Sequence, residues 1–476
     1  MRLTLDTLAT ANATKPAYDT AALDIGVVHF GPGAFHRAHQ AAYFDALAAK
    51  GPRWGICGVS LHSAGVRDAL KPQDGLYTLA ILDAEISYRI IGSMREVLVG
   101  PEDIEAVFER VTRPSVELVT STVTEKGYCL APDFSLDLQH PDIVHDLANP
   151  RTPKSFIGYI AEGLRRRRQA GLKPFVLIPC DNLPKNGKRL KEAVTVFAGQ
   201  SDHDLARWIH DTLQCPSTMV DSITPATDDA LRTRVKGTTG LEDAWPIQRE
   251  AFTQWVIEKH THEDGPDWQG VGVTLTDNVP AYERAKLRLL NGPHSTLAYM
   301  GLHRGYESVS EAMKDAELAD IVRKLMIEDV VPLLEAPEGL DLVAYSEAIL
   351  ARFRNPAIVH KLAQIAWDGS QKLPIRILSS LGEALDRGQD IRRLCLPLAA
   401  WMRFVRRKAI TGEAITDPLA DDLIALGKTC DDTVADTGRF LALRAVFPEA
   451  LVTDATVIAG LEAAYAELLR REAVFA

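Results

Sequence analysis

The sequence predicts an α/β fold in its first part, with helices around a parallel sheet, and a mostly α-helical second part. Short apolar runs alternate with helix-like stretches over the first half of the 476 residues. This alternation is typical of a doubly wound parallel sheet. A glycine-containing turn follows the first apolar run. Beyond about residue 285, long amphipathic stretches replace the strand patterns, which indicates a change of architecture.

Four apolar runs in the first half are predicted to be strands. They are 24–30, 54–61, 116–123 and 174–179. Helix-like stretches follow the first run, at about 34–49, and precede the fourth, at 155–170.

The second half contains amphipathic stretches at 315–329, 341–354 and 456–474, and few strand patterns. We therefore expect two domains, residues 1–285 and residues 286–476. The chain shows no internal repeat or low-complexity tract. Lys286 would lie at the junction of the domains, a common position for ligand clefts.

Composition narrows the class of protein. Hydrophobic residues make up 46% and charged residues 25% of the chain, which is ordinary for a globular protein. The formal net charge is -11. A general nucleic-acid-binding protein needs a basic surface, so that class is disfavoured.

The six cysteines are scattered and form no CxxC pair. Neither a structural zinc site nor a disulfide framework is indicated. The chain starts without a signal-peptide pattern, and no uncharged apolar stretch reaches the roughly 20 residues that span a bilayer. We expect a cytoplasmic enzyme.

The turn after the first predicted strand reads Gly31-Pro-Gly33-Ala34-Phe35-His36 and opens a helix-like stretch. At this position a dinucleotide pyrophosphate rests on backbone amides. The first glycine allows the tight turn and the second allows close approach of the phosphate. His36 stands where the usual pattern has a third glycine, so the motif is incomplete. The alternative is an ordinary strand–helix turn.

The preference between NAD and NADP stays open. An acidic residue that binds the ribose usually ends the second strand, but here the chain reads Ser60-Leu-His-Ser-Ala-Gly-Val-Arg67. An arginine in place of the acid makes NADP an alternative. Arg67 also fits an ordinary surface residue at a helix start.

Lys286, Asn291 and His294 fall within nine residues of a segment that otherwise resembles a helix. On an ideal helix, with Lys286 at zero, His294 lies near about 80° and Asn291 near about 140°, so all three can line one wall. Oxidation of a hydroxyl group needs a general base, a donor to the developing oxyanion and an orienting group. The trio offers one candidate for each role. The alternative is a solvated lysine beside residues that cap or pack.

Taken together, the motifs resemble those of the polyol-specific long-chain dehydrogenases, the mannitol dehydrogenase family, and within it the fructuronate (D-mannonate) reductases. The matching segments span nearly the whole chain in the family's order. They are 31–40, 124–128, 180–187, 219–221 with 223–225, 252–256, 286–294 and 368–374.

The resemblance implies a Rossmann-like N-terminal domain and a helical C-terminal domain that carries the catalytic lysine. It implies a nicotinamide-dependent, metal-independent oxidoreductase that acts on an alcohol or a ketone in carbohydrate metabolism. Gly31, Gly33, Ala34 and Phe35 would bind the cofactor, NAD or alternatively NADP.

By the same resemblance, Lys286 would be the acid/base, and Asn182 and Asn291 would contact the reacting oxygen. His294 and Asp221 would bind and orient substrate hydroxyls.

Lys372 would contact the substrate, and Glu125 would gate the exit of the proton from Lys286. A free lysine has a pKa near about 10.4, and lowering it to about 7–8 costs about 4 kcal/mol. Burial between domains and the charge of oxidised nicotinamide would supply this. Pro293 should kink or restart the helix near Asn291.

Three residues bear on the substrate. Lys126, where the mannitol enzymes tend to have glycine, would pair with a sugar-acid carboxylate. Gln364 and Gln371 also look like the uronate-reducing branch. We expect reversible conversion of D-fructuronate to D-mannonate. Alternatives are oxidation of mannitol, arabinitol or sorbitol, and reduction of tagaturonate; Lys126 also fits a turn lysine in water.

Two other patterns compete with this interpretation. Tyr282 and Lys286 fit the YxxxK of short-chain dehydrogenases, but they occur later than that fold usually ends. His29, His36 and His39 could indicate a metal, yet they lack partners at ligand spacing. A regulator that kept the fold without the chemistry is a third alternative. We expect no nucleic-acid or membrane partner, and a monomer.

Overall fold

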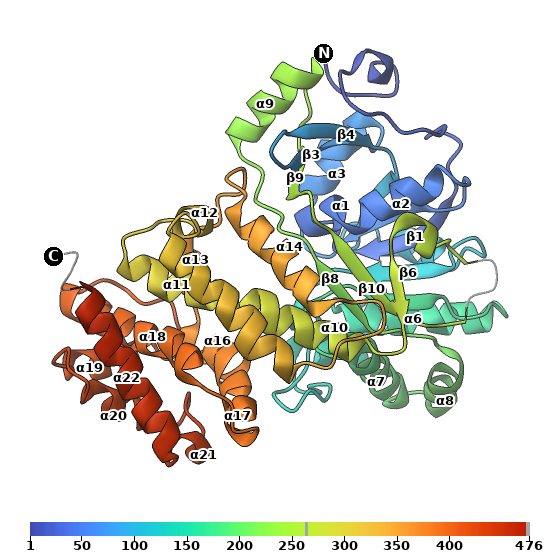
Figure 1. The fold of residues 1–476 in the computed structure, drawn as a ribbon. Helices are drawn as coiled ribbons and strands as arrows, with labels where there is room; N and C mark the ends of the chain where they lie inside the picture. Colours follow the sequence, from blue (N-terminus) through green and yellow to red (C-terminus); the bar gives the residue numbers. More distant parts are fainter. Residues whose placement is uncertain (262–264, 473–476) are drawn as a thin grey trace. The chain divides into compact units, whose positions relative to one another are not determined.

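The computed structural model describes residues 1–261 and 265–472 (Figure 1). The chain divides into two compact units, Met1–Pro280 and Ala281–Ala476. The helix α10, Val279–Lys286, runs across this division. The sequence-based boundary, between residues 285 and 286, falls at the end of the same helix.

A five-stranded sheet in the order β5-β2-β1-β6-β7 forms the centre of the first unit. Its strands are β1 (Ile25–Phe30), β2 (Gly55–Ser60), β5 (Met94–Val99), β6 (Leu118–Ser121) and β7 (Val176–Pro179). All pairings are parallel, and the four predicted strands are confirmed. The chain reverses its progress across the sheet between β1 and β6. Ligands of open α/β sheets bind outside the carboxyl ends of the strands at this switch point.

Successive side chains of the strands enter two apolar cores on opposite faces of the sheet. Val27 belongs to one core with α2, and Val28 belongs to the other with α4 and α6. The helices of this unit are α1 (Ala34–Ala38), α2 (Gln40–Ala48), α3 (Gly65–Leu70), α4 (Ile104–Val111), α5 (Pro141–Ala148), α6 (Phe156–Gln169), α7 (Asn186–Gly199), α8 (His203–Thr212) and α9 (Asp229–Thr239). The expected helix at 34–49 is interrupted at His39, whose ψ is -85°.

Two three-stranded sheets complete the first unit, and the sequence did not predict their strands. One has the order β4-β3-β9 and the other β11-β10-β8. Their strands are β3 (Tyr77–Leu82), β4 (Ser87–Ile91), β9 (Ile247–Glu250), β8 (Thr218–Asp221), β10 (Gln254–Glu258) and β11 (Thr274–Thr276). Because β8 ends at Asp221, the third sheet positions a candidate site residue.

The second unit is helical, as expected, and its described residues form no strand beyond an isolated bridge between Ser308 and Lys361. Its long helix α18 packs against α11, α19 and α22 (Figure 1). The helices after α10 are α11 (Gly292–His303), α12 (Val309–Ala312), α13 (Ala316–Lys324), α14 (Leu342–Arg354), α15 (Leu362–Ile365), α16 (Gly369–Leu373), α17 (Ser379–Asp386), α18 (Arg392–Thr411), α19 (Ala420–Lys428), α20 (Asp436–Leu441), α21 (Glu449–Val452) and α22 (Ala455–Glu472). Val474, the expected end of the last helix, lies outside the described residues.

Three π-helical segments interrupt these helices, at Leu287–Asn291, Leu325–Val330 and Pro374–Leu378. A π turn holds one residue more than an α turn and often occurs at functional sites. Pro293 follows the first segment closely, and a proline ring clashes with the carbonyl group four residues earlier. The wider turn relieves this clash, and α11 restarts at Gly292, as the sequence predicted.

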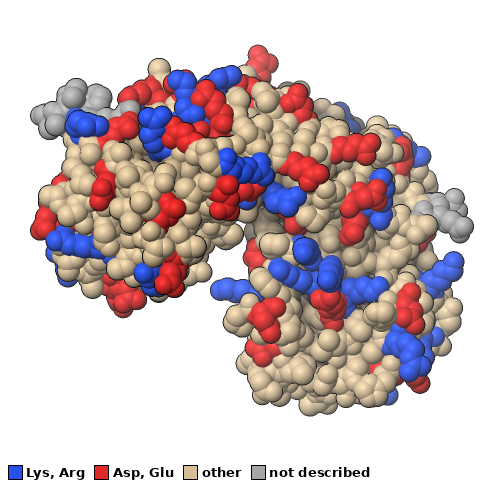
Figure 2. Space-filling model, turned by 60° about the horizontal axis from the view of Figure 1, so that its bottom comes forward, with Lys and Arg blue, Asp and Glu red and all other residues tan. Residues whose placement is uncertain are grey.

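Acidic and basic side chains are intermixed over most of the face shown in Figure 2. Within residues 1–261 and 265–472, none of the helices combines the length and the apolar composition that crossing a membrane requires.

Candidate active site

The turn after β1 leaves bare backbone at the switch point of the sheet. Gly31 has a φ of +86°, and a Cβ atom there would lie 2.3 Å from the carbonyl oxygen of Thr122. At Gly33 a Cβ would meet only the Gly31 oxygen, at 3.8 Å. Gly33 is exposed, and Ala34 and Phe35 behind it open α1. An open glycine beside a tight one fits the pyrophosphate of a dinucleotide.

Two stacked histidines support this turn from below. The Nε2 atom of His29 lies 3.2 Å from the Gly31 carbonyl oxygen, to which it can donate, and its Nδ1 lies 2.7 Å from Oγ1 of Thr120. The ring of His36 stacks on His29 with centroids 3.4 Å apart. Burial lowers the pKa of His29 to about 3, so the ring is neutral. The pair therefore joins β1, β6 and the glycine turn.

Arg67 is the residue that made NADP an alternative cofactor in the sequence, and two carboxylates hold its side chain. Its guanidinium group pairs with Glu102 and with Asp68. The second strand ends at Ser60, whose Oγ accepts a hydrogen bond from the amide of Ser63 at 3.3 Å. The guanidinium group of Arg67 is therefore already neutralised by carboxylates and is not aimed at the 2′-phosphate of an NADP.

Glu125 and Lys126 are exposed in a 3-10 turn, Glu125–Tyr128, that follows β6. The preceding residue, Thr124, has a φ of +65° and a ψ of +165°. Only glycine adopts this region readily, and a side chain there costs about 1–3 kcal/mol. The surrounding structure must hold the turn in place.

Asp181 supplies that support from the end of the neighbouring strand, β7. One carboxylate oxygen accepts a hydrogen bond from the Thr124 amide at 2.7 Å, and the other accepts one from the Tyr128 hydroxyl at 2.9 Å. Burial raises the pKa of Asp181 to about 6, partly offset by the hydrogen bond from Tyr128. Asp181 thus connects the turn that carries Glu125 to the segment after β7 that carries Asn182.

Asn186 connects the last residue of β7 to the first residue of β8. Its side-chain amide donates to the carbonyl oxygens of Pro179, Asp181 and Thr218, and its oxygen accepts from the Thr218 amide at 2.9 Å. Asn182 is exposed just after β7, and Asp221 is buried at the end of β8. Glu125 and Asn182 therefore follow strand ends that hydrogen bonds join, and Asp221 ends the strand whose first residue Asn186 holds.

In the second unit, Lys286 ends α10, and Asn291 ends the π-helical segment that follows. Both are partly buried. Nη1 of Arg376 donates to the Asn291 carbonyl oxygen at 3.4 Å and to Oγ of Ser295 at 3.2 Å. Because the π turn interrupts the helix, the angles of an ideal helix do not apply to the trio. Arg376 fixes the backbone at its far end.

His294 is buried in the first turn of α11. Its ring lies 4.5 Å from the ring of Phe353 and 5.0 Å, edge to face, from that of His360. Burial, and then the charges of His360, Arg352 and Arg376, keep its pKa well below the ordinary value. His294 Nε2 has no hydrogen-bond partner within the described residues. A neutral imidazole with an unused nitrogen can bind a substrate hydroxyl.

Lys372 lies in α16, just before the third π-helical segment. Burial and the nearby Arg376 lower its pKa, and Nζ lies 3.9 Å from a carboxylate oxygen of Asp368. The same arginine thus influences Lys372, Asn291 and His294. These three and Lys286 belong to one helical neighbourhood of the second unit.

Family models match both units. The model of the mannitol dehydrogenase Rossmann domain matches residues 25–270, and that of the mannitol dehydrogenase C-terminal domain matches residues 278–469. The chain belongs to the mannitol dehydrogenase family. The family consists of oxidoreductases that act on CH–OH groups, and the expected Rossmann-like and helical domains are confirmed.

Similar members of the mannitol dehydrogenase family differ in substrate. D-mannonate oxidoreductase of Escherichia coli (strain K12) is 40% identical over 469 residues, which covers 96% of each chain. Mannitol 2-dehydrogenase of Phaeosphaeria nodorum is 37% identical and covers 96% of this chain and 82% of its own. A solved structure of Pseudomonas fluorescens mannitol 2-dehydrogenase, in complex with NAD and D-mannitol, is 36% identical in sequence and has a TM-score of 0.82. The match covers 99% of this chain and 97% of that chain.

The structure also bears on the competing patterns. The hydroxyl of Tyr282 is buried and donates to the Glu338 carbonyl oxygen at 3.0 Å, so it is engaged in packing. The residues that sequence reasoning missed are Asp181, Asn186 and Arg376. The first two stand in the quoted motif 180–187, but their partners are distant in sequence. Arg376 stands four residues after Lys372, and this helical spacing is the only feature of the sequence that could have placed it near the candidate site.

Proposed function

We propose that this member of the mannitol dehydrogenase family interconverts D-fructuronate and D-mannonate with NAD and without a metal ion. The supporting observation is the helical neighbourhood of Lys286, Asn291 and His294, in which the lysine and the amide flank a π turn and the buried imidazole is neutral.

In the oxidation direction, Lys286 accepts the proton of the substrate hydroxyl as the carbonyl group forms. A bound NAD would supply the acceptor for the hydride that leaves the substrate carbon. The side-chain amides of Asn182 and Asn291 donate to the developing oxyanion, a contribution that needs no metal. His294 and Asp221 orient neighbouring hydroxyls.

Two further residues complete the proposal. Lys372 contacts the substrate, and Glu125, exposed on its turn, relays the proton of Lys286 to water. Residues 1–285 bind the dinucleotide through Gly31, Gly33, Ala34 and Phe35. Residues 286–476 carry the catalytic lysine.

NAD is preferred over NADP in this proposal because Arg67 is already paired with two carboxylates. A 2′-phosphate would have to displace them. The known complex of the Pseudomonas fluorescens relative contains NAD, in agreement with this preference.

A sugar acid is preferred over a polyol because Lys126 is exposed on the turn next to Glu125, where it can pair with a carboxylate. The 40% identity to a D-mannonate oxidoreductase supports this choice. The 37% identity to a mannitol 2-dehydrogenase favours a polyol as the second candidate. Tagaturonate is a related alternative for the reduction.

The test follows nicotinamide absorbance with D-mannonate and with mannitol, each with NAD and NADP. Turnover of D-mannonate with NAD is the expected result, and a chelator should not change it. Turnover of mannitol alone would leave the catalytic residues in place and refute the sugar-acid assignment.

Substitution of Lys126 sharpens this test. Lys126→Ala should raise the KM for D-mannonate by about tenfold or more, since a paired carboxylate loses its cation. Lys173→Ala, an exposed lysine elsewhere in the first unit, is the matched control. Equal KM values in the two variants would remove Lys126 from the site.

A further inference from the structure

A cavity of about 230 Å³ lies in the second unit at the C-terminal end of α11. His294 is in the first turn of that helix and His303 is its last residue. Nine residues of helix separate them by roughly 13 Å. None of the residues assigned to catalysis or substrate binding lines this cavity. It is therefore distinct from the candidate active site.

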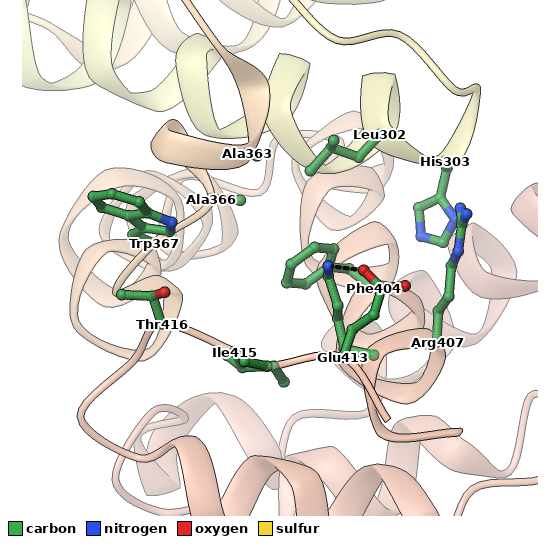
Figure 3. Close-up of a pocket in the computed structure, with 12 residues that line it drawn as sticks. Leu302, His303, Ala363, Ala366, Trp367, Phe404, Arg407, Glu413, Ile415 and Thr416 are labelled. Carbon is green, nitrogen blue, oxygen red and sulfur yellow. Dashed lines mark hydrogen bonds and ion pairs between the residues drawn. The ribbon is translucent and has the colours of Figure 1, made fainter. Parts of the chain in front are cut away.

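The wall of the cavity is largely apolar. It is formed by the end of α11, the segment around α15, the second half of α18 and the loop that follows α18 (Figure 3). Phe404 and Leu302 contribute apolar surface, and Trp367 lines the cavity although its side chain is 45% exposed. An exposed tryptophan beside a hollow of this size presents a flat apolar face to a small ligand.

The edge of the cavity carries one cation, Arg407, that forms no ion pair within the described residues, although its charge joins the hydrogen bond from Lys408 in lowering the pKa of Glu413 on the same wall. Lys408 is neutralised by Glu413, at 2.5 Å. Arg403 and Arg406 of the same helix pair with Asp432. Arg407 takes part in no ion pair among the described residues, and it points to the edge of the cavity beside His303 (Figure 3).

The wall of the cavity is joined to the segment that carries Lys372. The Asp368 amide, next to Trp367, donates to the carbonyl oxygen of Thr416 in the cavity loop at 2.8 Å. Two residues on, the amide and hydroxyl of Ser370 donate to Asp417 at 2.8 and 2.5 Å. A ligand that moves Trp367 or Thr416 would move the start of α16.

We propose that this cavity binds a small organic anion, a monocarboxylate with an apolar or aromatic body, and that its occupancy changes the affinity for substrate through Lys372. The apolar body packs against Trp367 and Phe404, and the carboxylate pairs with Arg407. The coupling to substrate affinity rests on the proposed function of Lys372, whereas the binding itself does not.

Binding is tested by calorimetry on the full chain with three probes: benzoate, its neutral analogue benzamide, and acetate. Benzoate should bind with a Kd of about 1 mM, and the other two at least tenfold more weakly. Benzoate should also quench tryptophan fluorescence in the wild type but not in Trp367→Phe. Equal binding of benzamide, or no binding of benzoate, would overturn the proposal.

Substitution locates the site. Arg407→Ala should raise the Kd for benzoate at least tenfold. Arg444 is an exposed arginine outside the cavity, and Arg444→Ala should leave this Kd unchanged. Both positions are on the surface, so the variants should fold, which a thermal melt verifies. Unchanged benzoate affinity in Arg407→Ala would refute the assigned anion contact.

Coupling is tested with D-mannonate and NAD. Benzoate should change the KM for D-mannonate at least threefold in the wild type and leave it unchanged in Arg407→Ala. An unchanged KM in the wild type would overturn the coupling. If D-mannonate is not turned over at all, the proposed function fails, and calorimetry still decides whether the anion binds.

Discussion

The two units position their candidate site residues in different ways. In the first unit, Glu125 and Asn182 follow neighbouring strand ends, and side chains distant in sequence hold them, as Asp181 holds Thr124. In the second unit, Lys286, Asn291 and His294 follow one another along a single interrupted helix. The first arrangement depends on long-range hydrogen bonds and the second on chain spacing. Substitutions of candidate residues in the two units should therefore have different effects.

The largest effect should come from the second unit. Lys286→Met should lower kcat by about 10²–10⁴-fold because the acid/base is lost. The Kd for NAD, measured by fluorescence titration, should stay unchanged. Lys428→Met, an exposed lysine on α19, is the control. A variant that keeps its kcat would assign the acid/base elsewhere.

The two asparagines test the proposed pair of oxyanion donors. Asn182→Ala and Asn291→Ala should each lower kcat by about 10²–10³-fold, the usual effect of losing an oxyanion donor. Since both amides would contact the same atom, the double variant should lose less than the product of the single losses. Strict multiplicativity in kcat would show that the two amides act independently.

The glycine turn sharpens the comparison in the first unit. Gly31→Ala should reduce the free energy of unfolding by about 1 kcal/mol or more, because its Cβ would clash with the Thr122 carbonyl and its φ is positive. In Gly33→Ala the added Cβ atom has open space around it, so the free energy of unfolding should not change, whereas the affinity for NAD should fall. Denaturant unfolding and a cofactor titration separate the two. Equal stability of both variants would contradict the geometry.

The smallest effect concerns pH. Since burial raises the pKa of Asp181 from 3.8 to about 6, its contribution to stability is present below about pH 4 and is lost as the pH rises through about 6. Asp181→Asn removes this dependence. The Tm of the variant minus the Tm of the wild type should therefore rise as the pH is raised from 4 to 7.5. The exposed Asp386→Asn is the control. A constant Tm difference would exclude the raised pKa.

The core of the fold was predictable because it is encoded locally. Short runs rich in apolar and β-branched residues marked β1, β2, β6 and β7, and Pro293 marked the restart of the helix at Gly292. β8 was not predicted, because Thr218–Asp221 contains only two apolar residues, whereas β6 and β7 lie within longer strand-like runs. The support from Asp181, Asn186 and Arg376 was hidden because these side chains bind groups that are distant in the sequence. The candidate site residues could be proposed from the sequence, but the side chains that hold them in place could not.

The π turn between Lys286 and Gly292 has a consequence for how this segment tolerates insertions and deletions. Removing one residue from Leu287–Asn291 would let the chain close as a regular α-helix. Because a π turn takes up one residue more than an α turn, α11 and His294 would then keep nearly the same place. The segment should therefore tolerate the loss of one residue better than a regular helix would, in which a deletion rotates everything that follows by about 100°.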